Sequence, residues 1–575
     1  MRQKFFLAAG AAICLVLLPI SAAPSAKQDT GNKSADGAIR VFRRPIPKED
    51  RIQHALNRLT FGAKPGDAAR VKTLGLKKWI DLQLHPERIP ENPVLDAKLQ
   101  PLDSLFMTTR ELVANYPEPQ MIRRMLDGRL AFPSDPGRRL VIEKVAERFE
   151  RRQKGGQDPP QEKELASLLS PDQLRELRTG TSVERVSAFE ALPAVRQNEI
   201  LVALPQGVRQ GMFPAAPPEL RRKIELAAGP RQVVALDLEQ GKLLRAIYSN
   251  RQLEELLTDF WFNHFNVYLD KGADHFLITE YERDVIRPRV LSRFRDLLNA
   301  TAKSPAMLFY LDNWQSRAPG RAGRGKRAAG GLNENYGREL MELHTLGVDG
   351  GYSQHDVTEV ARCFTGWTID QPGQGGPFSF NPRMHDEGEK VVLGVRIPPG
   401  GGIEDGEKVL DILARHPSTA HFISRKLAIR FVADDPPPTL VERMAQTFLK
   451  TNGDLRAVMT TMLESREFWS LGAYRSKLKS PLELVASAVR AADGDVDYAS
   501  GLVNQVARMG QPLYRKQEPT GYSNSSQEWL NSAGLLARMN FAVNLADNQV
   551  PGVKVAQASG LSGNVSLGSP EFQRH

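Results

Sequence analysis

Apolar residues that recur at the spacing of an α-helix are the feature that most restricts what this chain can fold into. In the first such run Ile52, Ala55, Leu56 and Leu59 lie three or four residues apart, and Gly62 follows. Residues at this spacing share one face of a helix, and glycine commonly ends one. Similar runs continue along most of the chain. The sequence therefore predicts a mainly α fold, with one large domain of many helices.

One segment departs from the helical pattern. Residues 377–397 carry alternating apolar positions on either side of a glycine-containing turn. Alternation with a period of two is typical of a β-strand, and two such strands around a turn form a hairpin. We therefore expect one small β-hairpin in the helical domain.

Changes in composition divide the chain. Residues 24–48 are polar and contain proline, which predicts a disordered linker. Residues 49–152 form the N-terminal helical part. In residues 153–230 the stretches QKGGQDPP, TGTS and AAPPEL separate short charged runs, and this predicts a charged helical insertion. Residues 231–575 hold the main helical domain with its hairpin.

The N-terminus predicts export. Arg2 and Lys4 precede an apolar run at residues 5–20, and small residues follow at 21–23. This order is typical of a secretory signal peptide, here residues 1–23. The run is shorter than the roughly 20 residues of a spanning helix. We expect a protein of the periplasm, cell surface or medium, with no transmembrane anchor after cleavage.

The cysteine content and the net charge argue against an intramolecular disulfide and against a nucleic-acid partner. The chain has two cysteines, Cys14 and Cys363, and removal of the signal peptide leaves only the second, so no intramolecular disulfide can form. The net charge of +10 is mild for 575 residues. The one dense basic stretch, residues 316–327, has no interleaved aromatic residues, and we expect no nucleic-acid partner.

Asn263 and His264 form the first candidate site. His264 lies at helical spacing from Phe260 and Trp261, within an apolar stripe. A buried imidazole requires a partner, which is a metal, a carboxylate or a backbone carbonyl. Asn263 would supply or orient that partner. The alternative is a core histidine bonded to a carbonyl oxygen.

Residues 333–346 and 353–366 predict a helical pair with the second candidate site. On one continuous helix Glu339 and His344 would flank the apolar stripe on opposite sides, each reaching a different neighbour. A glutamate beside that stripe has a raised pKa, which suits a general acid or base, but an ion pair with a buried arginine explains it equally. Asp356 fits a capping box with Ser353 and needs no catalytic role.

The third candidate is His385-Asp386 at the expected hairpin tip, with a ligand or acid–base role; an exposed turn is the alternative. Trp367 would cover a pocket or pack in the core. The motifs HExxH, GxSxG and the phosphate-binding GxxxxGK[ST] are absent. Histidine–carboxylate chemistry remains, either a divalent metal held by His264, His344 and His385 or metal-free acid–base catalysis.

These segments together resemble the bacterial DUF1800 family over nearly the whole mature chain. The motifs that carry the resemblance are HALNRLTFG (54–62), DFWFNHFNV (259–267), PAMLFYLDN (305–313), NENYGRELMELHTLGVDGGYSQHDVTEVAR (333–362), FTGWT (364–368), HDEGEK and LG (385–394), HPSTAHFISRKL (416–427) and SPEFQ (569–573). One departure is Gly337, where alanine is expected, and glycine there costs a helix up to about 1 kcal/mol.

The resemblance implies no reaction, since the family has no established activity. Similar proteins are commonly exported, and are often encoded beside exported DUF1501 proteins that resemble sulfatases and alkaline phosphatases. The resemblance therefore implies a DUF1501-type protein as a possible partner.

Two functional hypotheses follow. The first is a hydrolase with a site between helices: Glu339, His344, His264, His385 and Asp386 would be catalytic or metal-binding, and Asn263, Asn333, Arg338 and Trp367 would bind substrate. The alternative is a non-catalytic envelope protein that binds an exported partner. The hydrolase hypothesis requires the imidazoles of His264, His344 and His385 to gather in one cleft.

Overall fold

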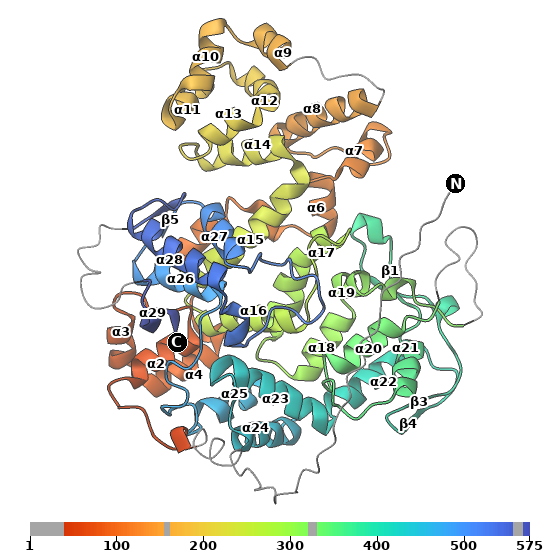
Figure 1. The fold of residues 1–575 in the computed structure, drawn as a ribbon. Coiled ribbons are helices and arrows are strands. Elements are labelled where there is room, and N and C mark those ends of the chain that lie inside the picture. Colours follow the sequence, from red (N-terminus) through yellow and green to blue (C-terminus); the bar gives the residue numbers. More distant parts are fainter. Residues whose placement is uncertain (1–39, 154–160, 320–330, 556–566) are drawn as a thin grey trace, which may run out of the picture.

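The computed structural model of the protein describes residues 40–153, 161–319, 331–555 and 567–575 (Figure 1). The prediction of a mainly α fold is confirmed, because helices dominate the described residues and the only sheets there are three two-stranded ones. The predicted signal peptide, and residues 24–39 of the predicted linker, lie outside these ranges. Residues 40–48 pack on the core, where Phe42 and Ile46 are buried.

The helices that precede α20 (Glu334–Glu342), apart from a projecting group, form the N-terminal half of the main body. They are α2 (Arg51–Leu59), α3 (Asp67–Leu74), α4 (Leu76–Leu84), α5 (Pro93–Leu99), α6 (Thr109–Asn115), α15 (Pro230–Tyr248), α16 (Gln252–His264), α17 (Asp274–Glu280), α18 (Phe294–Ala302) and α19 (Pro305–Tyr310). Helix α15 is buried on most of its surface and packs against α5, α16, α17 and the later helices α26 and α27. It is therefore the axis around which the first and last parts of the chain meet.

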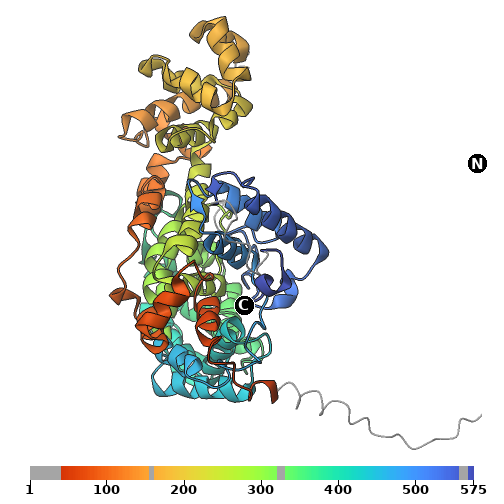
Figure 2. The same ribbon diagram turned by 90° about the vertical axis from the view of Figure 1, so that its left-hand side faces the viewer.

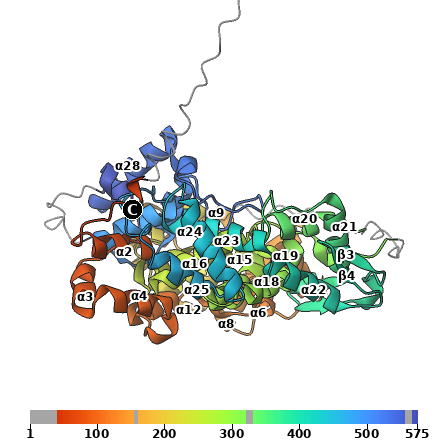
Figure 3. The same ribbon diagram turned by 90° about the horizontal axis from the view of Figure 1, so that it is seen from below.

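The C-terminal half completes this body. Its helices are α20 (Glu334–Glu342), α21 (Gln354–Cys363), α22 (Ile403–Ala414), α23 (Pro417–Phe431), α24 (Pro438–Lys450), α25 (Leu455–Leu463), α26 (Pro481–Ala491), α27 (Ser500–Arg508), α28 (Ser532–Ala546) and α29 (Pro570–Gln573). Figure 3 shows α3 and α4 at one end of the body and α20 to α22 at the other, with α15, α16 and α23 between them. Among the described residues no helix is both long enough and apolar enough to span a membrane.

A second group of helices projects from this body (Figures 1 and 2). It comprises α7 (Pro119–Leu126), α8 (Pro136–Gln153), α9 (Gln161–Leu168), α10 (Pro171–Thr179), α11 (Ser182–Glu190), α12 (Ala194–Ala203), α13 (Gln206–Met212) and α14 (Pro218–Ala228). Helices α9 to α14 enclose their own apolar core, which includes Leu177, Phe189 and Ile200. A smaller apolar cluster, with Tyr116 and Val233, joins the projecting helices to α6 and α15.

The strands pair differently from the single expected hairpin. The part at β3 (Lys390–Val392) and β4 (Val395–Ile397) is confirmed, with a tight turn at Leu393 and Gly394. However, β2 (Phe378–Phe380) pairs with β1 (Trp367–Ile369), which precedes the segment. A third pair joins β5 (Asp495–Val496) to β6 (Val553–Lys554). His385 therefore precedes β3 and does not lie at a hairpin tip.

Helices α20 and α21 approach each other closely at Gly337. A β-carbon on this glycine would lie 2.8 Å from the Val357 carbonyl oxygen and 3.1 Å from the Ala361 nitrogen. Glycine therefore permits the close contact between α20 and α21. The lower helix propensity of glycine at this position is the penalty that accompanies this packing. Cys363, at the end of α21, is fully buried as a free thiol, and burial raises its pKa to about 12.

Candidate functional site

His264 and His344 lie side by side in the core and share the neighbourhood of a lysine, Lys426 of α23. The His264 Nε2 atom lies 3.1 Å from the His344 carbonyl oxygen, to which it donates. The Lys426 Nζ atom lies 2.9 Å from the His264 Nδ1 atom and donates to it. The two imidazole rings are 6.3 Å apart. The expected core histidine bonded to a carbonyl is thus present, and a cation is its second partner.

Burial sets the charge of this group. Desolvation, followed by the nearby Lys426 charge, lowers the pKa of His264 well below its ordinary value and that of His344 to about 3. Both imidazoles are therefore neutral. Desolvation also lowers the pKa of Lys426 to about 8. Within the part of the chain that the structure describes, no carboxylate forms an ion pair with Lys426, and its ammonium interacts with the His264 ring and, at 5.4 Å from the ring centre, with Phe422.

His344 leaves one ring nitrogen unused. Helix α20 ends at Glu342, so His344 lies in the following turn and not on the helix that carries Glu339. The expected placement of the two on opposite sides of one helix was therefore wrong, because the helix is shorter. The Nε2 atom of His344 is buried without a hydrogen-bond partner among the described residues.

Glu339 has the electrostatics expected from sequence. Its side chain is half-buried and makes neither a hydrogen bond nor an ion pair with any residue in the described ranges. Desolvation, and then the neighbouring charge of Glu342, raises its pKa. The alternative of an ion pair with a buried arginine is not found for this side chain.

Three further predicted residues make structural hydrogen bonds, two of them to the backbone. Asn263 donates to the Asp259 carbonyl oxygen at 2.8 Å, and its Oδ1 atom accepts from the Tyr522 nitrogen at 3.1 Å. Asn333 caps α20 by accepting from the Tyr336 nitrogen. Arg338 donates to the Gln354 side chain at 2.6 Å. Likewise, Asp356 forms the predicted capping box with Ser353.

His385 belongs to a different cluster. Its Nδ1 atom lies 2.8 Å from the Thr365 carbonyl oxygen, and its Nε2 atom lies 3.1 Å from the Asp405 carboxylate. Lys390 donates to the same carboxylate at 2.6 Å, and all of these groups are buried. Within the described residues, no hydrogen bond or ring contact joins His385 to His264 or His344.

Asp386 and Trp367 also have structural partners. Arg362 donates to both carboxylate oxygens of Asp386, at 2.9 and 3.1 Å. Trp367 is fully buried and packs on Phe364 and against the backbone at Gly406. Of the three histidines that the hydrolase hypothesis requires in one cleft, the structure therefore brings His264 and His344 together and leaves His385 in another cluster. In the described ranges, no group of three or more His, Cys, Asp or Glu side chains is arranged to hold a metal ion.

Sequence reasoning missed Lys426. It lies three residues after the buried Ile423 and one before the buried Leu427 on α23. A lysine between buried apolar positions is the signal that would have identified it, by the same argument that selected His264.

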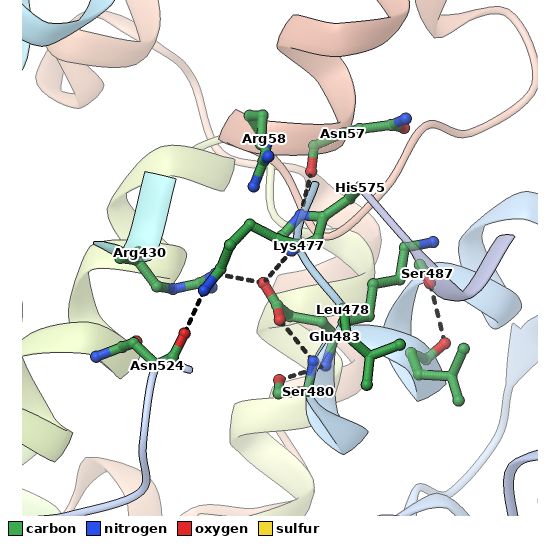
Figure 4. A network of polar contacts seen from close by, with 12 residues as sticks. Asn57, Arg58, Arg430, Lys477, Leu478, Ser480, Glu483, Ser487, Asn524 and His575 are labelled. Atoms are coloured by element: carbon green, nitrogen blue, oxygen red, sulfur yellow. Dashed lines mark hydrogen bonds and ion pairs between the residues drawn. The ribbon is translucent and has the colours of Figure 1, made fainter. Parts of the chain in front are cut away.

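One turn further along α23, Arg430 enters a second polar network (Figure 4). Its Nη1 atom donates to the Glu483 carboxylate at 2.5 Å, and the ring of His575 lies 3.7 Å from the same carboxylate. Burial alone raises the pKa of Glu483, but the charge of Arg430 is the largest opposing cause, and the pKa falls below its ordinary value. Burial also lowers the pKa of His575 to about 3, so its ring is neutral near pH 7. The buried carboxylate is therefore ionised, and Arg430 is the cation that pairs with it.

The two networks form one polar seam, defined by His344, His264, Lys426, Arg430, Glu483 and His575. The C-terminal part of α16 faces α23 along it. Asp259 and Asn263 of α16 line a cavity of about 20 Å³ together with Arg430 and Glu483, which is enough for about one water molecule. A cavity of this size holds solvent and no organic substrate.

The fold and the seam define a class: a large, mainly helical protein whose core contains a pair of buried histidines next to a lysine and a buried arginine–glutamate ion pair. The chain belongs to the family described as "Protein of unknown function (DUF1800)", whose sequence pattern matches residues 54–572. Neither the curated proteins nor the solved structures contain a significant match.

Proposed function

We propose that this protein is a non-catalytic protein of the cell envelope that binds a protein partner through the exposed face of helix α28. The observation that carries the proposal is an apolar surface on that helix. Leu535, Leu536, Met539 and Val543 are 43%, 61%, 59% and 59% exposed, and their spacing places them on one side of the helix.

The composition of α28 supports the proposal that a partner covers its exposed side. Its one charged residue, Arg538, is turned inward and donates to the Gln573 side chain at 3.0 Å and the Lys479 carbonyl oxygen at 2.8 Å. Leu530, just before the helix, adds a further exposed apolar side chain. Helices that are apolar on both faces are normally covered on both, and contiguous exposed apolar patches mark interaction sites.

The polar residues support the same proposal, because they are engaged in holding the fold. Both ring nitrogens of His264 have protein partners, as do both of His385. The hydrolase hypothesis required His264, His344 and His385 in one cleft, and His385 is tied to Asp405 elsewhere. As the partner we propose an exported DUF1501-type protein with an uncharged apolar groove that accepts the α28 face.

The test compares binding of the partner to two variants. Leu536→Asp with Met539→Asp places charges in the proposed interface, and affinity for the co-encoded DUF1501-type protein should fall at least tenfold. Val183→Asp with Val195→Asp is the matched control, because these valines are 65% and 89% exposed on the projecting helices. Equal binding by wild type and the α28 variant, absence of binding by wild type, or a wild-type homodimer that the α28 variant abolishes in light scattering, would each overturn the proposal.

A second candidate function rests on Lys426. An amine with a pKa of about 8, in contact with the neutral His264 ring, suits a general base near neutral pH. The corresponding hydrolase would cleave p-nitrophenyl acetate or p-nitrophenyl phosphate at a rate that rises with pH through about 8. Lys426→Met should then lower kcat at least 100-fold, whereas Lys408→Met on the exposed side of α22 should not. Equal rates for wild type and Lys426→Met would exclude this function.

A further inference from the structure

A cleft of about 560 Å³ lies away from the polar seam, where α2, α3 and α4 meet α15 and α26. Part of its wall comes from Leu56 and Thr60, which belong to the HALNRLTFG motif that neither function above uses. Small-molecule sites typically have volumes of about 300–1,000 Å³. The cleft therefore has the size of a ligand site, unlike the small cavity in the seam.

Its charged lining is predominantly positive. Lys64, Arg70 and Arg490 line the cleft, and Asp67 is the one carboxylate among the lining residues. Arg70 pairs with Asp67, and the Arg490 Nη2 atom lies 3.5 Å from the same side chain. One carboxylate thus faces three cations, which leaves uncompensated positive charge.

Lys64 is the cation of this cleft that has no carboxylate partner among the described residues. Its ammonium lies 4.9 Å from the centre of the Tyr248 ring and makes no hydrogen bond or ion pair with any residue that the structure describes. Desolvation, followed by the charge of Arg490, lowers its pKa to about 8. Its backbone nitrogen donates to Asp67 at 2.8 Å, which fixes the residue at the start of α3. The side chain is therefore held beside the cleft by other contacts, and its charge remains available.

Arg490 supplies a rigid counterpart. Its side chain is 4% exposed and donates to the Gly62 carbonyl oxygen at 2.5 Å and to the Ile247 carbonyl oxygen at 2.7 Å. These bonds hold the guanidinium in one position, so the site needs little rearrangement to receive an anion.

One part of the remaining wall is apolar, and the other part is polar, formed by Thr60, Gln83, Asn92, Ser249, Asn250 and Gln252. The apolar part is formed by side chains from α2, α3, α4 and the segment that follows, namely Leu56, Val71, Leu74, Trp79, Leu82 and Ile89. A ligand that contacts both the cations and this wall needs an anionic group and a hydrocarbon or aromatic body.

We propose that this cleft binds a small amphipathic anion, with its anionic group on Lys64 and Arg490 and its apolar body against Trp79 and the neighbouring aliphatic side chains. The site is separate from the α28 surface, and partner binding does not depend on it.

Isothermal titration calorimetry tests the proposal with decanoate, 2-naphthoate and acetate as probes. Decanoate, 2-naphthoate or both should bind with one site per chain, and which of them binds tells an alkyl from an aromatic body. Acetate should show no saturable binding, because it lacks the apolar part. Lys64→Met should weaken binding at least tenfold. Lys72→Met is the matched control, since Lys72 is an exposed lysine of α3, the helix that Lys64 precedes, and does not line the cleft.

Leu74→Trp provides an independent variant, because Leu74 lines the cleft and a larger side chain there fills it. It should abolish binding while the α28 partner interaction remains. The proposal is overturned if neither amphipathic anion binds saturably, or if Lys64→Met and Leu74→Trp both bind as wild type does.

Discussion

Asp274 lies at the start of α17 with no exposed surface, and neither of its carboxyl oxygens has a hydrogen-bond partner in the described part of the chain. Desolvation raises its pKa well above the ordinary value, against the opposing charge of Lys271. The pKa of Asp274 is therefore higher in the folded protein than in the unfolded chain. The favourable contribution of its protonated carboxyl to the free energy of unfolding is complete below the unfolded pKa, and it is lost as pH rises through the folded pKa.

Asp274→Asn should therefore stabilise the protein increasingly as pH rises from 4 to 8. The amide of the variant does not ionise. In the wild type, each pKa unit by which the folded value exceeds the unfolded value lowers the free energy of unfolding at high pH by about 1.4 kcal/mol. Thermal unfolding at several pH values measures the difference. Asp435→Asn, at an exposed position, should show no such trend. A difference in Tm that is independent of pH would contradict the raised pKa.

At the residue scale, the sequence predicted the environment of several candidate residues, but not most of their hydrogen-bond partners. The apolar stripe around His264 showed that its ring is buried, and the Ser353–Asp356 spacing showed a helix cap, because both depend on neighbours within four residues. Lys426 as a partner of His264 and Asp405 as a partner of His385 depend on tertiary packing. A single sequence carries no local signal for such contacts.

At the scale of elements, helix propensity and helix packing favour different residues at position 337. Alanine is the better helix former by about 1 kcal/mol, but its β-carbon would meet the backbone of α21 at 2.8 Å. Gly337→Ala should therefore destabilise the protein by about 1–3 kcal/mol, as overpacked substitutions do. Urea unfolding gives the free energy.

Gly207 of α13 is the matched control, since a β-carbon there meets nothing within 4 Å. Gly207→Ala should raise stability by a few tenths to about 1 kcal/mol. If Gly337→Ala were also stabilising, α20 and α21 would not be packed as closely as the structure has them.

The boundaries of elements were predicted less well than their existence. The helix expected over residues 333–346 ends at Glu342, because the backbone of His344 turns to accept the His264 hydrogen bond. Apolar alternation correctly marked β2, β3 and β4, but did not reveal that β2 pairs with β1. Alternation specifies which face of a strand is buried, and the partner strand is chosen by the tertiary fold.

At the scale of the whole molecule, the projecting helices α9 to α14 have a core separate from that of the main body. All six tryptophans lie outside residues 119–228. Tryptophan fluorescence therefore reports only on the main body, whereas far-ultraviolet circular dichroism reports on both helical groups. Unfolding in urea should give two circular-dichroism transitions, of which only one coincides with fluorescence.

Ile200→Asp sharpens this prediction, since Ile200 is fully buried in the smaller core and a buried unpaired charge is strongly destabilising. The variant should lose helix content in water while its fluorescence transition stays within experimental error of wild type. One shared transition, lowered equally by both probes, would mean that the two cores unfold as one cooperative unit.

Helical periodicity was enough to predict the mainly α class, because it is repeated in nearly every segment. How the helices assemble was not predictable. Helix α15 lies at the centre because segments before and after it, separated by hundreds of residues, pack on its sides, and the chain order gives no indication of this.

The buried thiol of Cys363 has a practical consequence. Since its side chain is inaccessible and its pKa is near 12, a thiol reagent reacts only in molecules in which α21 has separated from its neighbours. Labelling of the chain without Cys14 would therefore follow a single site, and its rate under native conditions would measure how often this region opens, on a timescale that equilibrium unfolding does not report.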